Sequence, residues 1–365
     1  MRHAVIAAQK AVGRKTVLAL PVLYPRELLT AMDLHVVELW GPPGAPRAPG
    51  AGHVQAYVCA VVRNAMAFLA SGGADDVDAL LFPHTCDSLQ GLATLFPDFR
   101  DGRKPVFRHF PPRGEDRPLA RAFLASELRS LVGELERWTG RPLSLDRLRS
   151  AIALHAEIDR LRSVLLSRRA FLPDSDSELY ALLRRGEFLW PEQHRIELLD
   201  ATGRLRSDRA CHGVPLMFSG IVPEPMAIFE HLATAGACVV ADDYAAVGRR
   251  LPLSVPPPDG DPFSILTARF FSLPPCPMRT ADQGRRMDYL AGLFRRSGAA
   301  GLVVHVPKFC EPEAFDIPAI LRRFGEIESP VLLLETDLEA GLSTQGLTRL
   351  EAFVEMLKAK RGERP

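Results

Sequence analysis

Two cysteines of this chain lie in the same local pattern, Pro-x-x-Cys followed by an acid, at the end of an apolar run. The first copy ends at Cys86 and Asp87, and the second ends at Cys310 and Glu311. A short apolar run that stops at a proline is typical of a buried strand ending in a turn. Each thiol is therefore predicted just beyond the carboxyl end of a strand, where open α/β sheets bind ligands. Two such thiols in opposite halves indicate a duplicated domain with a metal or cluster between the copies.

Cys59 offers a third thiol near these two. It lies on an amphipathic helix predicted over residues 55–69, directly before the strand that leads to Cys86. A right-handed crossover brings such a helix back across the sheet, so Cys59 is a candidate ligand. The alternative is a small buried hydrophobic side chain, which is a common role of free cysteine.

The other three cysteines carry weaker signals. Cys238 lies inside an apolar strand and is predicted to be inert, whereas Cys276 lies in a rigid Pro-Cys-Pro loop and could reach a metal. Cys211 precedes a predicted strand and so lies at its amino end, away from the carboxyl edge where the site is expected. Structural disulfides are not expected in a chain that reads as intracellular. Because no close CxxC pair is present, the fold must assemble any metal site.

Polar residues also gather where the predicted strands end. Convergence at one sheet edge is what a site on doubly wound sheets requires, although acids after strands also serve as helix N-caps. Beyond the cysteines, these residues are Asp87, Ser219, Gly220, Asp242, Asp243, Glu311, Glu335 and Asp337. Three arginine pairs, at 249–250, 285–286 and 295–296, could bind the phosphates of a large anionic substrate. The favoured interpretation of these pairs is solvated helix faces.

Composition restricts the class of protein. A length of 365 residues predicts two domains, and 47% apolar with 24% charged residues is typical of a globular protein. A net charge of +1 argues against nucleic acid or an anionic membrane as the main partner. No apolar run reaches the roughly 20 residues of a membrane span and no signal peptide is recognisable, so a cytoplasmic location is expected. Neither a dinucleotide fingerprint nor a P-loop is present.

The order of apolar runs predicts an α/β fold: two doubly wound parallel-sheet domains, flavodoxin- or Rossmann-like, with a helical domain between them. Residues 1–117 alternate strands with helices and contain Cys59 and Cys86. Residues 118–206 show helical periodicity, with Ser144 as an N-cap. Residues 207–365 return to alternation and contain Cys310, with the proline-rich stretch 251–277 expected as an extended connection.

Seven short segments stand in an order and spacing that resemble one known family. In the first half they are Pro25-Arg26-Glu27-Leu28-Leu29, Tyr57-Val58-Cys59-Ala60-Val61-Val62-Arg63 and Phe82-Pro83-His84-Thr85-Cys86-Asp87-Ser88. In the second half they are Phe218-Ser219-Gly220, Val239-Val240-Ala241-Asp242-Asp243, Lys308-Phe309-Cys310-Glu311-Pro312 and Thr348-Arg349-Leu350-Glu351-Ala352-Phe353. Nearly the whole chain therefore resembles the 2-hydroxyacyl-CoA dehydratase component D / benzoyl-CoA reductase family, and the helical middle is the least specific part.

This resemblance implies one [4Fe–4S] cluster per subunit, held by Cys59, Cys86 and Cys310, with one iron left open. It implies an ATP-hydrolysing iron–sulfur activator protein that supplies an electron, and an acyl-CoA thioester that is reduced to a ketyl radical anion. Dehydratases of the family then expel the β-hydroxyl, and benzoyl-CoA reductases reduce the aromatic ring. The partner would be a homologous second subunit or a second copy of the chain. Ser219 and Gly220 would line the substrate pocket.

One departure from the family concerns the residues after Asp243. Many relatives have a cysteine there, whereas residues 244–249 of this chain contain none, which weakens a double-cubane cluster. Cys276 keeps a Pro-Cys-Pro pattern seen in some relatives. The open alternatives are a double-cubane small-molecule reductase, a non-catalytic cluster-holding subunit, and zinc on the same cysteines. Zinc is less expected because its sites usually add a histidine or a fourth cysteine.

Overall fold

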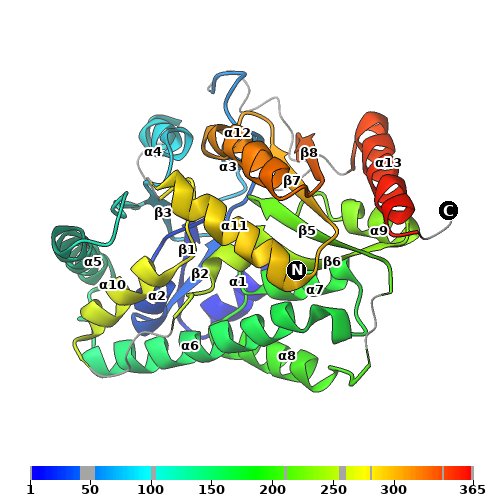
Figure 1. Ribbon diagram of the computed structural model, residues 1–365. Helices are drawn as coiled ribbons and strands as arrows, with labels where there is room; N and C mark the ends of the chain where they lie inside the picture. Colours follow the sequence, from blue (N-terminus) through cyan, green and yellow to red (C-terminus); the bar gives the residue numbers. More distant parts are fainter. Residues whose placement is uncertain are drawn as a thin grey trace.

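Two parallel sheets of four strands organise the computed structural model of this chain (Figure 1). The structure describes residues 2–41, 54–99, 104–208, 212–254, 260–279, 282–338 and 341–362. The strand orders are β2-β1-β3-β4 and β6-β5-β7-β8, so each sheet places its first strand between its second and third. The expected α/β class with two parallel-sheet units is confirmed, and the two sheets repeat one topology.

The predicted apolar runs form the strands. Parallel registers such as Leu18 opposite Leu80, and Phe218 opposite Val303, align their carboxyl ends at one edge of each sheet. The strands of the first sheet are β1 (Lys15–Ala19), β2 (Leu34–Glu38), β3 (Ala79–Pro83) and β4 (Val106–His109). Those of the second sheet are β5 (Val214–Gly220), β6 (Ala237–Tyr244), β7 (Gly301–Pro307) and β8 (Val331–Thr336).

Helices cover both faces of the first sheet, because successive strand residues point to opposite sides. Leu18, Leu80 and Phe82 lie in one apolar cluster with residues of α1, α3 and α4. Val17 and Leu81 lie in another, with residues of α2, α5 (Pro118–Thr139) and α10 (Pro262–Ser272). The helices next to the sheet are α1 (Arg2–Ala11), α2 (Arg26–Ala31), α3 (Ala60–Ala70) and α4 (Asp87–Phe99).

The second sheet is covered in the same way. Met217 and Leu302 pack with α11 and α12 on one side, and Phe218 and Val303 belong to the cluster that includes α9 and α13 on the other. The helices are α9 (Ala227–Thr234), α11 (Gln283–Ser297), α12 (Glu311–Glu326) and α13 (Thr344–Lys360).

The middle of the chain is helical, as expected, and contains no strand among its described residues. Ser144 is the N-cap that the sequence predicts, since its hydroxyl accepts from the backbone N–H of Arg147 at 3.3 Å. The preceding helix ends at Gly140 in the left-handed conformation, with φ of 69°. The helices are α5 (Pro118–Thr139), α6 (Leu145–Ser167), α7 (Asp176–Arg185) and α8 (Pro191–Gly203).

The expected extended connection at 251–277 is wrong in part, because it contains α10 (Pro262–Ser272). Asp261 caps this helix by accepting from Ser264 N–H at 3.0 Å, and Pro262 occupies the first turn, where proline is tolerated. Phe263, Leu266 and Phe270 then lie in one apolar cluster with residues of α5.

One apolar cluster contains residues from both sheets and from the helical middle. The division at 117/118 and 206/207 stays a prediction, since α10 from the last segment shares an apolar cluster with α5 from the middle one. Within the part of the chain described here, no helix is both long and apolar enough to cross a membrane.

Candidate metal centre

The three predicted cysteine ligands each stand at the start of a helix. Cys59 is the residue before α3 and Cys310 the residue before α12, while Cys86 directly precedes Asp87, the first residue of α4. The helix expected over 55–69 therefore begins later than predicted, at Ala60. Helix starts after parallel strands lie at the carboxyl edge of the sheet. The repeated Pro-x-x-Cys pattern follows the third strand of each sheet.

The three thiols lie near enough to influence one another. Burial, together with the negative charge of Cys86, raises the pKa of Cys59 to about 11. Burial also raises the pKa of Cys310 well above its usual range, with Glu313, Cys59 and Cys86 acting in the same direction. A cation bound between the sulfurs would offset the repulsion between the thiolates.

Backbone N–H groups face each sulfur from the first turn of its helix. They oppose the effect of burial and lower the thiol pKa, and they come from Val61 and Val62 at Cys59 and from Ser88 and Leu89 at Cys86. At Cys310 the N–H of Glu313 has the same effect. Unpaired N–H groups and the positive end of the helix dipole stabilise negative charge at these positions.

Contacts between the two halves bring Cys310 to the other thiols. The N–H of Ala60 donates to the carbonyl oxygen of Lys308 at 3.4 Å, so the chain segments on either side of the site touch. Asp337, just after β8, binds Arg63 of α3 at 3.1 Å and Lys308 at 2.9 Å. Phe309, between Lys308 and Cys310, has a positive φ of 61°, a strained conformation of the kind found at ligand sites.

The donor type, three cysteine thiols, is the one that iron–sulfur clusters use. Among the described residues, no three His, Cys, Asp or Glu side chains are grouped closely enough to hold one metal ion. In a [4Fe–4S] cluster, each cysteine binds a different iron, so the thiols surround the group without meeting at a point. The hydroxyl of Thr85, next to Cys86, is buried without a hydrogen-bond partner, which suits a donor that faces the sulfur atoms of a bound cluster.

Ser219 and Gly220 lie inside the second sheet at the end of β5. Ser219 is fully buried, and its hydroxyl donates to Asp243 at 2.9 Å. A side chain at Gly220 would meet the carbonyl oxygen of His305 at 1.8 Å, so the close approach of two strands requires glycine there. The substrate-binding role of Ser219 and Gly220 stays a prediction.

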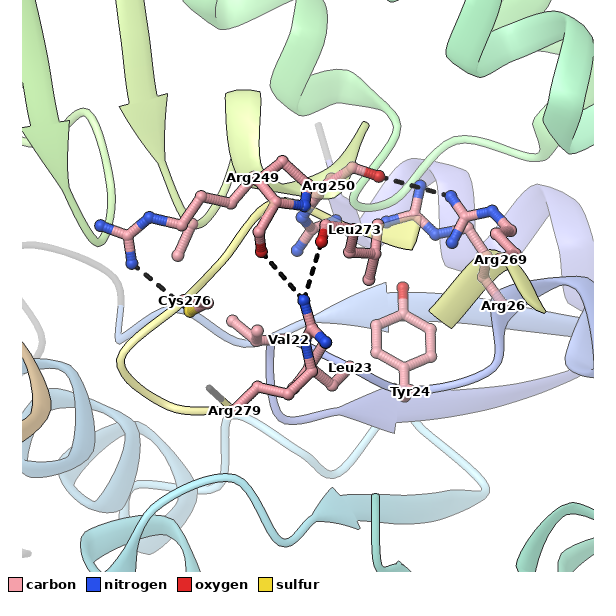
Figure 2. A pocket seen from close by; sticks show the side chains of 12 residues that line it. Val22, Leu23, Tyr24, Arg26, Arg249, Arg250, Arg269, Leu273, Cys276 and Arg279 are labelled. Atoms are coloured by element: carbon pink, nitrogen blue, oxygen red, sulfur yellow. Dashed lines mark hydrogen bonds between the residues drawn. The ribbon is translucent and has the colours of Figure 1, made fainter. Parts of the chain in front are cut away.

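The remaining cysteines have other partners. The thiol of Cys276 accepts a hydrogen bond from Arg249 at 3.5 Å (Figure 2). Cys238 is half-buried and disulfide-bonded, so the expectation of no structural disulfides is wrong at this position. Cys211 lies outside the described residues.

The sequence-based interpretation of the paired arginines is wrong for three of them. Arg249, Arg250 and Arg286 are 4%, 9% and 1% exposed. Arg249 and Arg286 both bind Asp243, so this acid serves an ion pair. One sequence pattern could have indicated these buried ion pairs. Asp243, in an Asp-Asp pair at the end of an apolar strand, lies six residues before Arg249 of an Arg-Arg pair, and this spacing permits buried pairing.

The architecture and the site define a class of protein: a two-sheet parallel α/β protein with a candidate three-cysteine centre at the carboxyl edges of both sheets. The sequence profile of the 2-hydroxyglutaryl-CoA dehydratase, D-component family matches residues 21–357, and the chain belongs to this family.

Similar proteins span almost the full length of the chain. The lactoyl-CoA dehydratase subunit beta of Anaerotignum propionicum is 26% identical over 350 residues, covering 94% of this chain and 92% of the relative. The (R)-2-hydroxyglutaryl-CoA dehydratase subunit beta of Acidaminococcus fermentans is 23% identical over 360 residues, covering 96% and 95%. A benzoyl-CoA reductase subunit of Thauera aromatica is 26% identical over 330 residues, covering 88% and 85%. The relatives are lyases and an oxidoreductase, the two enzyme classes expected.

Proposed function

We propose that this chain is the iron–sulfur subunit of an ATP-dependent, radical-type 2-hydroxyacyl-CoA dehydratase or benzoyl-CoA reductase-like enzyme. Cys59, Cys86 and Cys310 would hold one [4Fe–4S] cluster. The observation that supports this most directly is the placement of three mutually interacting thiols at three helix starts, contributed by both halves of the chain. Family membership supplies the acyl-CoA chemistry.

The bound cluster would supply one electron and a Lewis-acidic iron for a thioester carbonyl. The chain's own residues have three tasks. The cysteines provide three ligands, so one iron has no cysteine ligand. The first-turn N–H groups at Val62, Leu89 and Glu313 stabilise the anionic sulfurs. Burial of Cys59 and Cys310, 7% and 9% exposed, keeps water away from the centre.

The proposal includes partners and a location. The similar proteins are each named as one subunit of an enzyme, so we propose a homologous second subunit or a second copy of this chain. An ATP-hydrolysing iron–sulfur activator would deliver the electron, and the substrate would be an acyl-CoA. The location would be the cytoplasm.

A double-cubane centre has less support. It requires additional thiolates, whereas Cys276 accepts a hydrogen bond from Arg249 and Cys238 is disulfide-bonded. The double-cubane small-molecule reductase and the zinc protein therefore stay as outcomes that the following experiment distinguishes.

The test is the iron and acid-labile sulfide content of anaerobically purified protein. We expect about four irons per chain, a loss of most of this iron in each of Cys59→Ala, Cys86→Ala and Cys310→Ala, and full retention in the matched control Cys276→Ala. About eight irons would favour the double-cubane alternative. Absence of iron after anaerobic reconstitution, or full iron in all three variants, would contradict the proposal. A non-catalytic subunit would keep its iron but show no turnover with partner and activator.

A further inference from the structure

A cavity lined with arginine side chains lies beside the candidate metal centre. It has a volume of about 50 Å³ and is formed by the β1–α2 loop, by η2 (Gly248–Arg250) after β6, and by the end of α10 with the loop that follows (Figure 2). Twelve described residues line the cavity, and none of these twelve is an Asp or a Glu. Its five arginines are Arg26, Arg249, Arg250, Arg269 and Arg279.

Three of these arginines are held in place by carboxylates outside the cavity lining. Each guanidinium is anchored from behind, so its position does not depend on a ligand. These three arginines therefore contribute fixed positive charge to the wall, while most of their N–H donors are occupied by the carboxylates. The pairs are Arg250 with Glu38 at 2.5 Å, Arg249 with Glu313 at 2.5 Å and Asp243 at 3.0 Å, and Arg269 with Asp159 at 2.5 Å and Glu27 at 3.0 Å.

Arg279 has no carboxylate of its own among the described residues. It is 5% exposed, its Nη2 donates to the carbonyl oxygens of Leu273 and Pro274 at 2.8 and 3.0 Å, and its buried Nε has no partner. Asp116, the acid whose charge acts on it, makes two 2.6 Å hydrogen bonds to Arg121. Burying an arginine without an anionic partner costs free energy, so the positive charge of Arg279 favours the binding of an anion in the cavity.

A second arginine on the cavity wall is also poorly matched. Arg26 lies 3.8 Å from Glu38, whose two oxygens already bind Arg250. Arg162, buried nearby with an unpartnered Nε, shows the same excess of positive charge. Burial and the charges of Arg26 and Arg250 lower its pKa to about 10.

We propose that this cavity is a binding subsite for a phosphate group. Arg26 and Arg279, which lack full carboxylate pairing, line a space that fits one small oxyanion, and the three paired arginines add positive charge to its wall. Arginine recognises phosphate through paired N–H donors. Two sources could supply this group. One is a phosphate of the CoA moiety, an assignment that rests on the proposed function, and the other is free inorganic phosphate. Arg249 connects the cavity wall to Glu313, one helical turn after Cys310, so the subsite adjoins the candidate metal centre.

The experiment is calorimetric titration of anaerobically purified full-length protein with inorganic phosphate and, separately, with CoA, in sodium chloride at constant ionic strength. We expect the wild type to bind at least one of them, and both Arg279→Gln and Arg26→Gln to lower that affinity about tenfold, the effect of one lost charged hydrogen bond. Arg295→Gln removes the same charge from an exposed position of α11 and should leave affinity unchanged.

Each outcome decides the proposal. Binding of CoA with weak binding of phosphate identifies the cofactor moiety as the source, and the reverse identifies the free anion. No binding of either ligand by the wild type, or unchanged affinity in both cavity variants, would overturn the subsite. Should Arg279→Gln not fold, Arg26→Gln decides alone. Iron measured on the same samples separates the two proposals: iron-loaded protein that binds neither ligand contradicts only this subsite.

Discussion

At the residue scale, the molecule uses cysteine where helices usually place serine or aspartate. An N-cap side chain faces the unpaired N–H groups of the first turn. At Cys59, Cys86 and Cys310 the side chain in that position is a thiol, so the capping positions are also the positions of the proposed metal ligands. The sequence predicts this at Cys86 and Cys310, because a proline-terminated apolar run shows where the strand ends and where the next helix can start. It does not at Cys59, which the sequence pattern predicts inside a helix.

Gly220 illustrates a residue whose role depends on the spacing between strands. Its substitution by alanine places a Cβ 1.8 Å from the carbonyl oxygen of His305, a backbone atom that cannot rotate away. We expect Gly220→Ala to lower the free energy of unfolding by about 3 kcal/mol or more in urea titration without substrate. Gly203→Ala, in open space in α8, should change it by less than about 1 kcal/mol. Equal stability of both variants would contradict a structural role for Gly220.

At the element scale, sequence patterns predict the strands and the duplicated topology because buried parallel strands are short apolar runs. They do not predict α10, since the proline-rich composition around it obscured the Asp261 cap and the apolar periodicity. They also miss the buried ion pairs of Arg249 and Arg286. A charged side chain looks solvated in a sequence, and the spacing of Asp243 and Arg249 permits their pairing without showing that the pair is buried. Arg286, 43 residues from Asp243, has no such local signal.

The loop after β8 links these elements across the site. Asp337→Ala removes the partner of both Arg63 and Lys308, and because these groups are exposed or partly exposed to solvent, we expect only a small loss of stability. Because the contact holds α3 beside the β7–α12 turn, we expect iron to be released to a chelator several-fold faster. Arg323→Ala, which breaks exposed ion pairs to Asp288 and Glu326 in α11 and α12, is the matched control. Equal release rates in the two variants would argue against this link.

At the scale of the whole molecule, a buried ion pair connects the two sheets. Glu38 at the end of β2 is fully buried and binds Arg250 of the second half at 2.7 and 2.5 Å. Tyr24 and Trp40 donate to the same carboxylate at 2.6 and 2.8 Å. Although burial opposes ionisation, the charge and hydrogen bonds of Arg250 dominate and lower the Glu38 pKa from 4.5 to about 2. The carboxylate therefore stays ionised in the folded protein at neutral pH.

This depressed pKa makes the contribution of Glu38 depend on pH. A carboxyl group that ionises more readily when folded stabilises the protein above its unfolded pKa and loses that effect as pH falls through the folded value. As the pH falls from 4.5 to about 2, the free energy of unfolding should lose about 3 kcal/mol of stabilisation from Glu38. We expect Glu38→Gln to lower the free energy of unfolding by about 3 kcal/mol at pH 7, leaving Arg250 buried without its anion.

The difference between the wild type and Glu38→Gln should shrink by roughly half by pH 3, because the carboxyl group is protonated there in the unfolded chain but still largely ionised in the folded one. Urea unfolding of metal-free protein at pH 7, 5, 4 and 3 measures this difference in the free energy of unfolding. Metal-free protein is used because acid would otherwise release the proposed cluster during the measurement. Adding Arg250→Met to Glu38→Gln removes the unpaired charge and should recover part of the stability at pH 7. A difference that stays constant over this range would show that Glu38 stabilises the contact between the sheets by packing rather than by its charge.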